Sequence, residues 1–284
     1  MSTLFVNQLT NIDFSFLDPD HGVVGESWLL DIQLAGTLNE EGMVLDFGLV
    51  KKAVKNYVDQ FIDHCLVIPR DYEGCEVEDL GDRLIIDFTL VSGETIHHES
   101  VSSAVALIDA EAITEESVRE NILQALREVI PDNVHHLDLQ LYPQPDLPSY
   151  YRYSHGLRKH QGNCQRIAHG HRSDLKVFIN GKPDDQTRRY WLDKWRDIYI
   201  GTRHHVINET DTHLEFEYTA EQGIFRLNMP KERCYLIDVE STVENIAQHL
   251  ADETAKMNPG QQVRIMAFEG IGKGAIATAS IDPE

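Results

Sequence analysis

Three histidines in the second half of the chain have the types and spacing of a metal site. His169 and His171 stand two residues apart, just before the apolar alternation of residues 175–179. If both belong to that strand, its period of two places their imidazoles on one face. His155, at the end of the preceding strand, can then face them and complete the three-histidine set of catalytic zinc, with an open fourth position. Spacing alone leaves the alternative of chance proximity, because the chain has 14 histidines.

Basic residues gather around the same stretch of an acidic chain. The formal net charge is −22, yet residues 152–176 hold one acid, Asp174, among their lysines and arginines. Local positive charge against a negative background predicts a site for a phosphorylated substrate, and a solvated basic face is the alternative. Cys164 lies among these charges, so we expect it to react as the thiolate. The basic residues are Arg152, Arg158, Lys159, Arg166, Arg172 and Lys176.

Composition limits the class of protein. A length of 284 residues favours two domains. Hydrophobic residues make up 42%, and no apolar run approaches the ~20 residues of a membrane span, so no membrane partner is expected. The acidic excess argues against general nucleic-acid binding, which relies on clustered lysine and arginine.

The amino terminus and the cysteines indicate a cytoplasmic protein. Residues 1–16 mix polar and apolar side chains and lack the basic start of a signal peptide. The cysteines are few and widely spaced, and no pair has the CxxC spacing. We therefore expect free thiols and a cytoplasmic location.

The chain reads as a diverged tandem duplication divided by a proline-rich segment. Residues 142–149 hold three prolines, which break helices and cannot donate to a sheet ladder. We therefore predict two domains, residues 1–143 and residues 149–284. Similar stretches recur in the same order in both domains: residues 31–36 and 176–181, residues 107–109 and 236–238, and residues 120–122 and 244–246.

Hydrophobic periodicity predicts an α+β fold with antiparallel sheets. The adjacent pairs His97-His98 and His135-His136 are expected at the surface, because neighbours in an extended chain point to opposite faces. The glycine-rich residues 270–274 lack the P-loop spacing and are predicted to form a turn into a last strand. The predicted helices span residues 47–63, 115–129 and 242–257, and the predicted strands include residues 4–16, 27–35, 84–90 and 263–268.

The residues around Cys164 resemble those of a known family. The order of motifs resembles that of the 6-pyruvoyl- and 6-carboxy-tetrahydropterin synthase family. It consists of a histidine after a strand, then a cysteine, then His-Gly-His, then a strand ending in glycine, and later a glutamate at the end of the last strand. The resemblance covers nearly the whole chain, once per half. It implies two tandem tunnelling-fold (T-fold) domains, each an antiparallel sheet with two helices packed on one face, and a homo-oligomer. The other matching motifs are Gly42-Met43-Val44-Leu45-Asp46-Phe47, Asp63-His64, Thr242-Val243-Glu244-Asn245 and Phe268-Glu269.

The resemblance implies a metal and a base. His155, His169 and His171 would hold zinc, which would bind the hydroxylated side chain of 7,8-dihydroneopterin triphosphate and acidify its carbon-bound proton. Cys164 would be the general base, in a relay with an aspartate–histidine pair.

The resemblance also implies contacts to the substrate. Glu269 would grip the amino and ring NH groups of the pterin through charge-assisted hydrogen bonds. Thr242 and Arg166 are expected to contact the substrate as well. Triphosphate would leave by elimination.

The first half departs from the family pattern at its metal positions. Asp18 stands where the first histidine belongs, residues 24–26 read Val-Gly-Glu in place of His-Gly-His, and Pro143 falls at the anchoring glutamate. That half is therefore not expected to hold the metal or the pterin.

The aspartate–histidine pair shows the opposite distribution. Asp63-His64 is kept in the first half, whereas the second half reads Arg203-His204. Family active sites lie between neighbouring subunits, so we predict that the first half donates Asp63 and His64 to the zinc and Cys164 of the second, within a chain or across an oligomer. The alternative is that Asp63 caps a helix, His64 packs, and His204 serves in the relay.

The favoured function is a zinc-dependent 6-carboxy-tetrahydropterin synthase, a carbon–oxygen lyase of the queuosine and deazapurine pathway. The alternatives are a 6-pyruvoyl-tetrahydropterin synthase and a non-catalytic pterin binder, although a pure binder has no use for Cys164. In a structural zinc protein, Cys164 would itself be the fourth ligand. The expected partners are the small-molecule pterin triphosphate and further copies of the chain.

Overall fold

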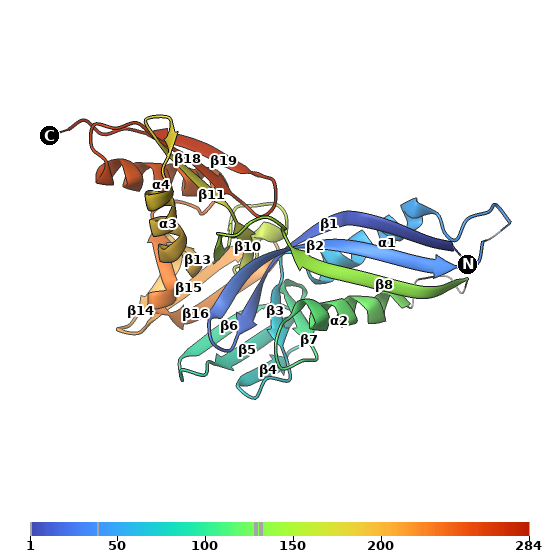
Figure 1. The fold of residues 1–284 in the computed structure, drawn as a ribbon. Coiled ribbons are helices and arrows are strands. Elements are labelled where there is room, and N and C mark those ends of the chain that lie inside the picture. Colours follow the sequence, from blue (N-terminus) through green and yellow to red (C-terminus); the bar gives the residue numbers. More distant parts are fainter. Residues whose placement is uncertain (1, 39, 128–129, 131–132, 284) are drawn as a thin grey trace.

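The two halves of the chain form similar units, each a sheet with two helices packed on one face (Figure 1). A computed structural model describes residues 2–38, 40–127, 130 and 133–283. No helix among these residues is long and apolar enough to cross a membrane.

The first half is built on two long strands, β1 and β2, which pair antiparallel. The sheet has the order β7-β3-β1-β2-β8, with β3 parallel to both β1 and β7. The apolar alternation of β1 sends Ile12, Phe14 and Phe16 into the core formed with α1 and α2. The elements are β1 (Ser2–Asp18), β2 (Gly22–Gly36), α1 (Phe47–Phe61), β3 (Leu66–Pro69), β4 (Cys75–Asp79), β5 (Arg83–Thr89), β6 (Thr95–Val101), η1 (Ser102–Ala104), β7 (Val105–Ile108), α2 (Glu115–Arg127) and β8 (Val134–Pro143).

The second half has a similar order of helices and strands, with additional strands. Its strands form two four-stranded sheets, β10-β9-β13-β17 and β12-β11-β18-β19. The N-cap of helix α4 is Thr242, whose hydroxyl accepts from the backbone NH of Asn245. The elements are β9 (Tyr151–His155), η2 (Asn163–Gln165), β10 (His169–Ser173), β11 (Leu175–Ile179), β12 (Lys182–Pro183), α3 (Asp185–Lys194), β13 (Arg196–Thr202), η3 (Arg203–His205), β14 (Val206–Glu209), β15 (His213–Ala220), β16 (Gly223–Pro230), η4 (Lys231–Arg233), β17 (Cys234–Ile237), α4 (Val243–Met257), β18 (Val263–Phe268) and β19 (Gly274–Ala279).

A six-stranded sheet of order β14-β15-β16-β6-β5-β4 joins the halves. Strand β16 of the second half pairs antiparallel with β6 of the first, with Leu227 opposite His98. The prediction of a surface position is therefore wrong for His98, which is 1% exposed. Its neighbour His97 points the other way and contacts Asp87.

The main sheets of the two halves also cross, and they do so at small residues. The hydroxyls of Ser15 and Ser154 lie 2.7 Å apart at the crossing. A Cβ on Gly25 would lie 2.0 Å from the carbonyl oxygen of Tyr153, and one on Gly170 would lie 2.6 Å from the Cα of Gly25. Contacts this close exclude any side chain, so glycine is required on both strands.

Strand register shows which residues of the halves are equivalent. Ser15 pairs with Gly25 in the first half, just as Ser154 pairs with Gly170 in the second. The offset of 145 between the two glycines also relates residues 31–36 to residues 176–181, which agrees with the repeat found in the sequence.

Candidate active site

The three histidines of the second half meet in the core beside the crossing. His155 on β9 pairs with His169 on β10, and His171 follows two residues later on the same face. Each is at most 1% exposed. One ring nitrogen of each lies within 4.8 Å of the others, so the three imidazoles converge on one point.

The hydrogen bonds of these rings leave one nitrogen of each free for a metal. The Nδ1 atoms of His155 and His169 donate to the backbone carbonyls of Ser241 and Arg166, over 2.8 and 3.0 Å. The Nε2 atoms of all three histidines are buried without a hydrogen-bond partner among the described residues. Unpaired buried nitrogens are costly, and metal-binding histidines characteristically tie their other nitrogen to a carbonyl or carboxylate.

The protonation state of these rings also fits a metal. Burial lowers the pKa values of His155 and His169 well below the ordinary value, and the neighbouring histidines lower them further. Both rings are therefore neutral, the form in which histidine binds a metal. The residues present thus fit the metal that the sequence predicts.

Asp13 of the first half supports the third histidine, and sequence reasoning missed it. Its Oδ1 lies 3.3 Å from Nδ1 of His171 and accepts a hydrogen bond from Ser27, and its Oδ2 lies 3.4 Å from Nζ of Lys273. Burial alone would raise the pKa of Asp13, but His171, Lys273 and Ser27 hold it below its ordinary value. The signal in the sequence was a lone acid within the apolar stretch Ile12–Leu17 of β1.

Asp63 and His64 reach this site from the first half of the same chain. They follow α1, and His64 has a left-handed backbone with φ of 57°. The backbone NH of His64 donates to the carbonyl of Asp13 over 2.7 Å, and the NH of Asp13 donates to Oδ1 of Asp63 over 2.9 Å. These reciprocal bonds fasten the pair to β1, beside the histidines of the second half.

Cys164, on the turn η2, lies beside the Asp63–His64 pair. Oδ2 of Asp63 lies 2.5 Å from Nδ1 of His64. The Sγ of Cys164 lies within 4.8 Å of a ring nitrogen of His64 and one of His169. Burial alone would lower the pKa of His64, but Asp63 and Cys164 outweigh it and raise this pKa to about 10. An imidazolium beside a thiol favours the thiolate form.

Arg166, in the second half, makes hydrogen bonds to the first half. It is 4% exposed, and its Nη1 donates to the carbonyls of Asp63 and His64, both over 3.5 Å. Nη1 also lies 3.0 Å from Sγ of Cys65, and Nε donates to Gln222. The guanidinium is thus occupied by protein partners, at the edge of the relay.

The other basic residues of the segment are dispersed, so they do not form one anion site. Arg152 pairs with Asp197 over 2.6 Å, and Lys176 lies 4.0 Å from Asp174. The guanidinium of Arg172 stacks over the ring of Tyr150 at 3.8 Å. The remaining two, Arg158 and Lys159, are exposed on the loop after β9.

Glu269 and Lys273 flank the turn between β18 and β19. The predicted turn is present, with Phe268 opposite Gly274. Nζ of Lys273 lies 3.7 Å from Glu269 and 3.4 Å from Asp13, so this ammonium links the predicted pterin-binding residue to the metal site. No motif in the sequence places Lys273 in the site. Thr242 lies at the start of α4, one residue after Ser241, the partner of His155.

The second half has no aspartate–histidine pair at the position equivalent to residues 63–64. Counted along β3 and β13 from the pairs with Ser15 and Ser154, those residues correspond to Arg196 and Asp197. Asp197 shares the left-handed backbone of its counterpart, with φ of 54°. The prediction that Arg203-His204 takes this position is therefore wrong.

His204 lies elsewhere, in a separate cluster. It belongs to η3, after β13, and its side chain is 51% exposed. Its Nε2 lies 3.6 Å from Oε1 of Glu240, and His205 contacts the same carboxylate. The structure thus brings His64, not His204, to Cys164.

The equivalent position of the first half has lost its metal ligands. Residues 24–26 occupy the place of the His-Gly-His motif, as predicted. The residue opposite the first of them is Phe16, so the expectation that Asp18 replaces the first histidine is wrong. Glu26 is 7% exposed, its pKa is raised to about 7 by burial, and it lies 3.8 Å from Nη1 of Arg152. One carboxylate among apolar neighbours cannot replace three histidines. Pro143 lies at the position equivalent to Glu269, as the registers of β8 and β18 show.

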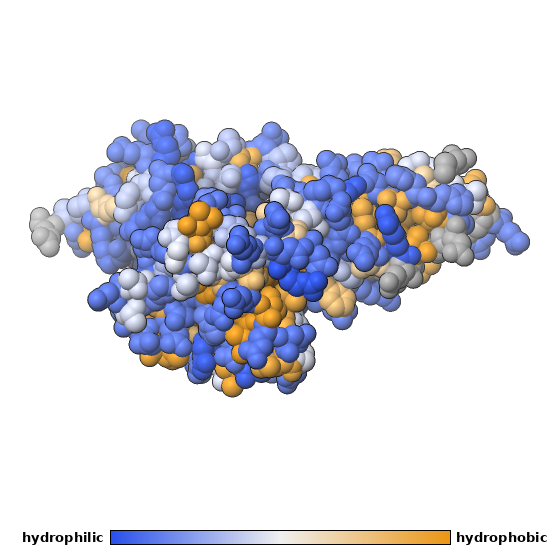
Figure 2. Space-filling view, turned by 90° about the horizontal axis from the view of Figure 1, so that it is seen from below, coloured by the Kyte–Doolittle hydropathy of each residue, from blue (hydrophilic) through white to orange (hydrophobic). Residues whose placement is uncertain are grey.

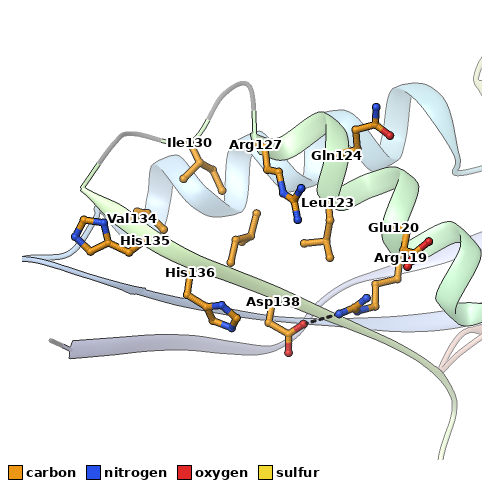
Figure 3. A pocket seen from close by; sticks show the side chains of 11 residues that line it. Arg119, Glu120, Leu123, Gln124, Arg127, Ile130, Val134, His135, His136 and Asp138 are labelled. Atoms are coloured by element: carbon orange, nitrogen blue, oxygen red, sulfur yellow. Dashed lines mark hydrogen bonds and ion pairs between the residues drawn. The ribbon is translucent and has the colours of Figure 1, made fainter.

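One hollow lies away from the histidines. A cavity of about 960 Å³ runs between α2 and β8 (Figure 3), where Arg119 and Asp138 form an ion pair of 3.0 Å. A second cavity, of about 530 Å³, is lined by Tyr150, Arg152 and Asp197, at the altered site of the first half.

Comparison with known proteins places the chain in one family. A model of the 6-pyruvoyl tetrahydropterin synthase family matches residues 19–146 and again residues 146–278. A Pyrococcus horikoshii protein, provisionally named 6-carboxy-5,6,7,8-tetrahydropterin synthase, is 25% identical over 121 residues, 43% of this chain and 68% of that protein. The 6-carboxy-5,6,7,8-tetrahydropterin synthase of Rickettsia felis is 38% identical over 48 residues, 16% of this chain and 35% of that protein. The crystal structure of 6-pyruvoyl tetrahydropterin synthase from Plasmodium vivax aligns with 51% of this chain and 93% of that chain, at 18% identity and a TM-score of 0.43.

These findings confirm the predicted tandem duplication and the predicted fold class, α+β with two T-fold domains. They also confirm the prediction of an enzyme of the lyase type, at the level of the family. The domain division at residues 143–149 stays a prediction. The chain belongs to the 6-pyruvoyl tetrahydropterin synthase family, as a tandem pair of T-fold domains.

Proposed function

We propose that this chain is a zinc-dependent pterin synthase that eliminates triphosphate from 7,8-dihydroneopterin triphosphate and gives 6-carboxy-5,6,7,8-tetrahydropterin, in the queuosine and deazapurine pathway. The observation that carries the proposal is the convergence of Cys164 with His64 and His169, with Asp63 behind His64. A metal position, a thiol base and a proton relay then share one site.

The zinc would be held by Nε2 of His155, His169 and His171, the buried nitrogens without another partner. When bound, zinc supplies Lewis-acid polarisation of the hydroxylated side chain of the substrate. The carbonyl of Ser241 and the carboxylate of Asp13 orient two of the rings.

The protein supplies the base. Cys164 would be the general base that removes the carbon-bound proton of the substrate side chain, with His64 beside its sulfur. Asp63 keeps the Nδ1 proton of His64 in place, so the other ring nitrogen faces the sulfur. The proton can pass between Cys164 and His64 as the elimination proceeds, and triphosphate departs.

The substrate ring is bound by Glu269. Its carboxylate accepts hydrogen bonds from the amino and ring NH groups of the pterin. Lys273, 3.7 Å away, adds one positive charge beside the bound anion. Thr242 borders the site at the start of α4, whereas Arg166 supports the relay from behind.

The names of the curated relatives support the 6-carboxy product over the 6-pyruvoyl product. The test is to incubate zinc-loaded protein with 7,8-dihydroneopterin triphosphate and identify the products. Acetaldehyde with 6-carboxy-tetrahydropterin supports the proposal, whereas pyruvoyl-tetrahydropterin selects the alternative synthase. Absence of turnover from protein that binds zinc leaves the non-catalytic pterin binder.

We also propose that the chain forms a homo-oligomer in the cytoplasm. Figure 2 shows apolar residues gathered over the first half, at the right of the view. On α1, Leu49 and Phe61 are 63% and 45% exposed, and strand β8 is an edge of its sheet. Exposed apolar patches and open edges are typical of association surfaces. The free thiols of Cys65, Cys75 and Cys234 fit a reducing compartment. Light scattering at low and high protein concentration tests the assembly.

A further inference from the structure

A second group of metal-binding side chains lies in the second half, outside the active site. His204, His205 and Glu240 place one ligand atom each within 4.8 Å of one another. The Nε2 atoms of His204 and His205 lie 3.6 and 3.5 Å from the same oxygen, Oε1 of Glu240. These separations are too long for hydrogen bonds, and they suit three ligands that share one ion at about 2 Å.

Local backbone structure explains why two adjacent histidines can act together here. Neighbours in a strand point to opposite faces, which makes such pairs poor chelators. Residues 203–205 form the 3-10 turn η3 instead. The rings of His204 and His205 consequently lie with centroids 4.5 Å apart, on the same side as Glu240.

The polar atoms of this cluster lack partners. Both carboxylate oxygens of Glu240 are buried, and no described residue donates a hydrogen bond to either. Nε2 of His205 is likewise buried and unpaired, on a side chain that is 4% exposed. A buried carboxylate without donors is unfavourable unless an ion or a proton compensates it.

We propose that His204, His205 and Glu240 form a second divalent-metal site, with two imidazoles and one carboxylate as ligands. This donor set suits zinc and related transition ions, whereas magnesium and calcium prefer oxygen ligands alone. His204 is half exposed, so the ion can enter from solvent and retain water at an open position.

The second site is coupled to the first through one peptide. Glu240 precedes Ser241, whose carbonyl accepts the Nδ1 proton of His155. An ion held by Glu240 therefore fixes the backbone that orients a ligand of the first site. Arg158 and Lys159, on the neighbouring loop, contribute positive charge near His205. If Arg158 or Lys159 moved to pair with Glu240, its charge would be neutralised without a metal ion. This ion pair is the alternative to a second metal site.

The test is the number of zinc ions per chain. Tag-free protein is stripped with a chelator, reloaded with Zn²⁺, dialysed, and measured by inductively coupled plasma mass spectrometry. We expect two equivalents in the wild type, one in Glu240→Gln and one in His169→Ala. Asp87→Asn, which alters the exposed contact between Asp87 and His97, is the matched control and should keep two.

The variants separate the two sites. The second site is overturned if the wild type binds one equivalent of zinc that is lost in His169→Ala and kept in Glu240→Gln. That result leaves the proposed function intact. Loss of one equivalent in Glu240→Gln, with none lost in His169→Ala, supports the second site and contradicts the metal centre of the proposed function. If Glu240→Gln fails to fold by circular dichroism, His204→Ala removes a half-exposed ligand and must lower the count by one. An unchanged count in that variant also overturns the second site.

Discussion

Replacing Asp63 with asparagine tests the relay with little change in shape. Oδ1 of Asp63 accepts from the backbone NH of Asp13, so the new amide keeps its oxygen there and turns its NH₂ toward Nδ1 of His64. Nδ1 must then accept, which moves the ring proton to Nε2, the nitrogen that faces Cys164. In this tautomer, His64 cannot take a proton from the sulfur, and the charge that favours the imidazolium is lost.

The expected effect is a fall in kcat of about 10²–10⁴-fold, the usual contribution of a positioned acid–base group, or about 3–5 kcal/mol in the barrier. Release of triphosphate from 7,8-dihydroneopterin triphosphate measures it. Zinc content should be unchanged, because Asp63 contacts none of the three metal-binding histidines through its side chain in the described structure. Asp59→Asn, in the exposed Lys55–Asp59 pair of α1, is the control and should retain full turnover. Equal turnover in the two variants would refute the relay.

Three further changes test other parts of the structure. Asp13→Asn should weaken zinc binding by about 10–100-fold, as loss of a histidine-orienting carboxylate does, and competition with a chelating dye measures it; an unchanged Kd contradicts the contact with His171. Gly25→Ala should destabilise the protein by about 1–3 kcal/mol or more in urea titrations, because its Cβ would lie 2.0 Å from the Tyr153 carbonyl; wild-type stability would show that the sheets do not cross there. Burial lowers the pKa of His98 to about 3, so the unfolded chain binds a proton below pH 6.5 that the folded chain does not, and stability should fall by about 2 kcal/mol from pH 7 to 5. His98→Gln should remove that part of the pH dependence, and equal slopes for variant and wild type would count against the buried neutral ring.

Much of the site could be predicted because it depends on short-range geometry. The period of a strand puts His169 and His171 on one face, and the pairing of adjacent strands brings His155 opposite. The long helices have clear apolar stripes, and α1 spans Phe47–Phe61 against a predicted 47–63. Helix α3 was not predicted, because its buried side consists of only Trp191 and Leu192 in an otherwise polar stretch, which is too little to form a clear apolar stripe.

The remaining features depend on how the halves meet, which local pattern does not encode. In the sequence, Asp13 looks like an ordinary acidic residue of a strand, and only the crossing of the sheets brings it next to His171. In the sequence, His98 looks like a surface residue, and only the pairing of β16 with β6 buries it. Insertions and deletions between the halves make an alignment by motif unreliable. The equivalence of His64 with Asp197 could therefore be found only from the strand register. These residues required the tertiary structure.

The crossing at Ser15 and Ser154 has a consequence for each half taken alone. His155, His169 and His171 come from one half, and Asp13, Asp63 and His64 beside them come from the other. At the equivalent position, Phe16 stands in place of the first histidine and Asp197 stands in place of His64. Under the proposed function, the site needs residues of both halves, so we expect either half alone to lack activity even where it folds.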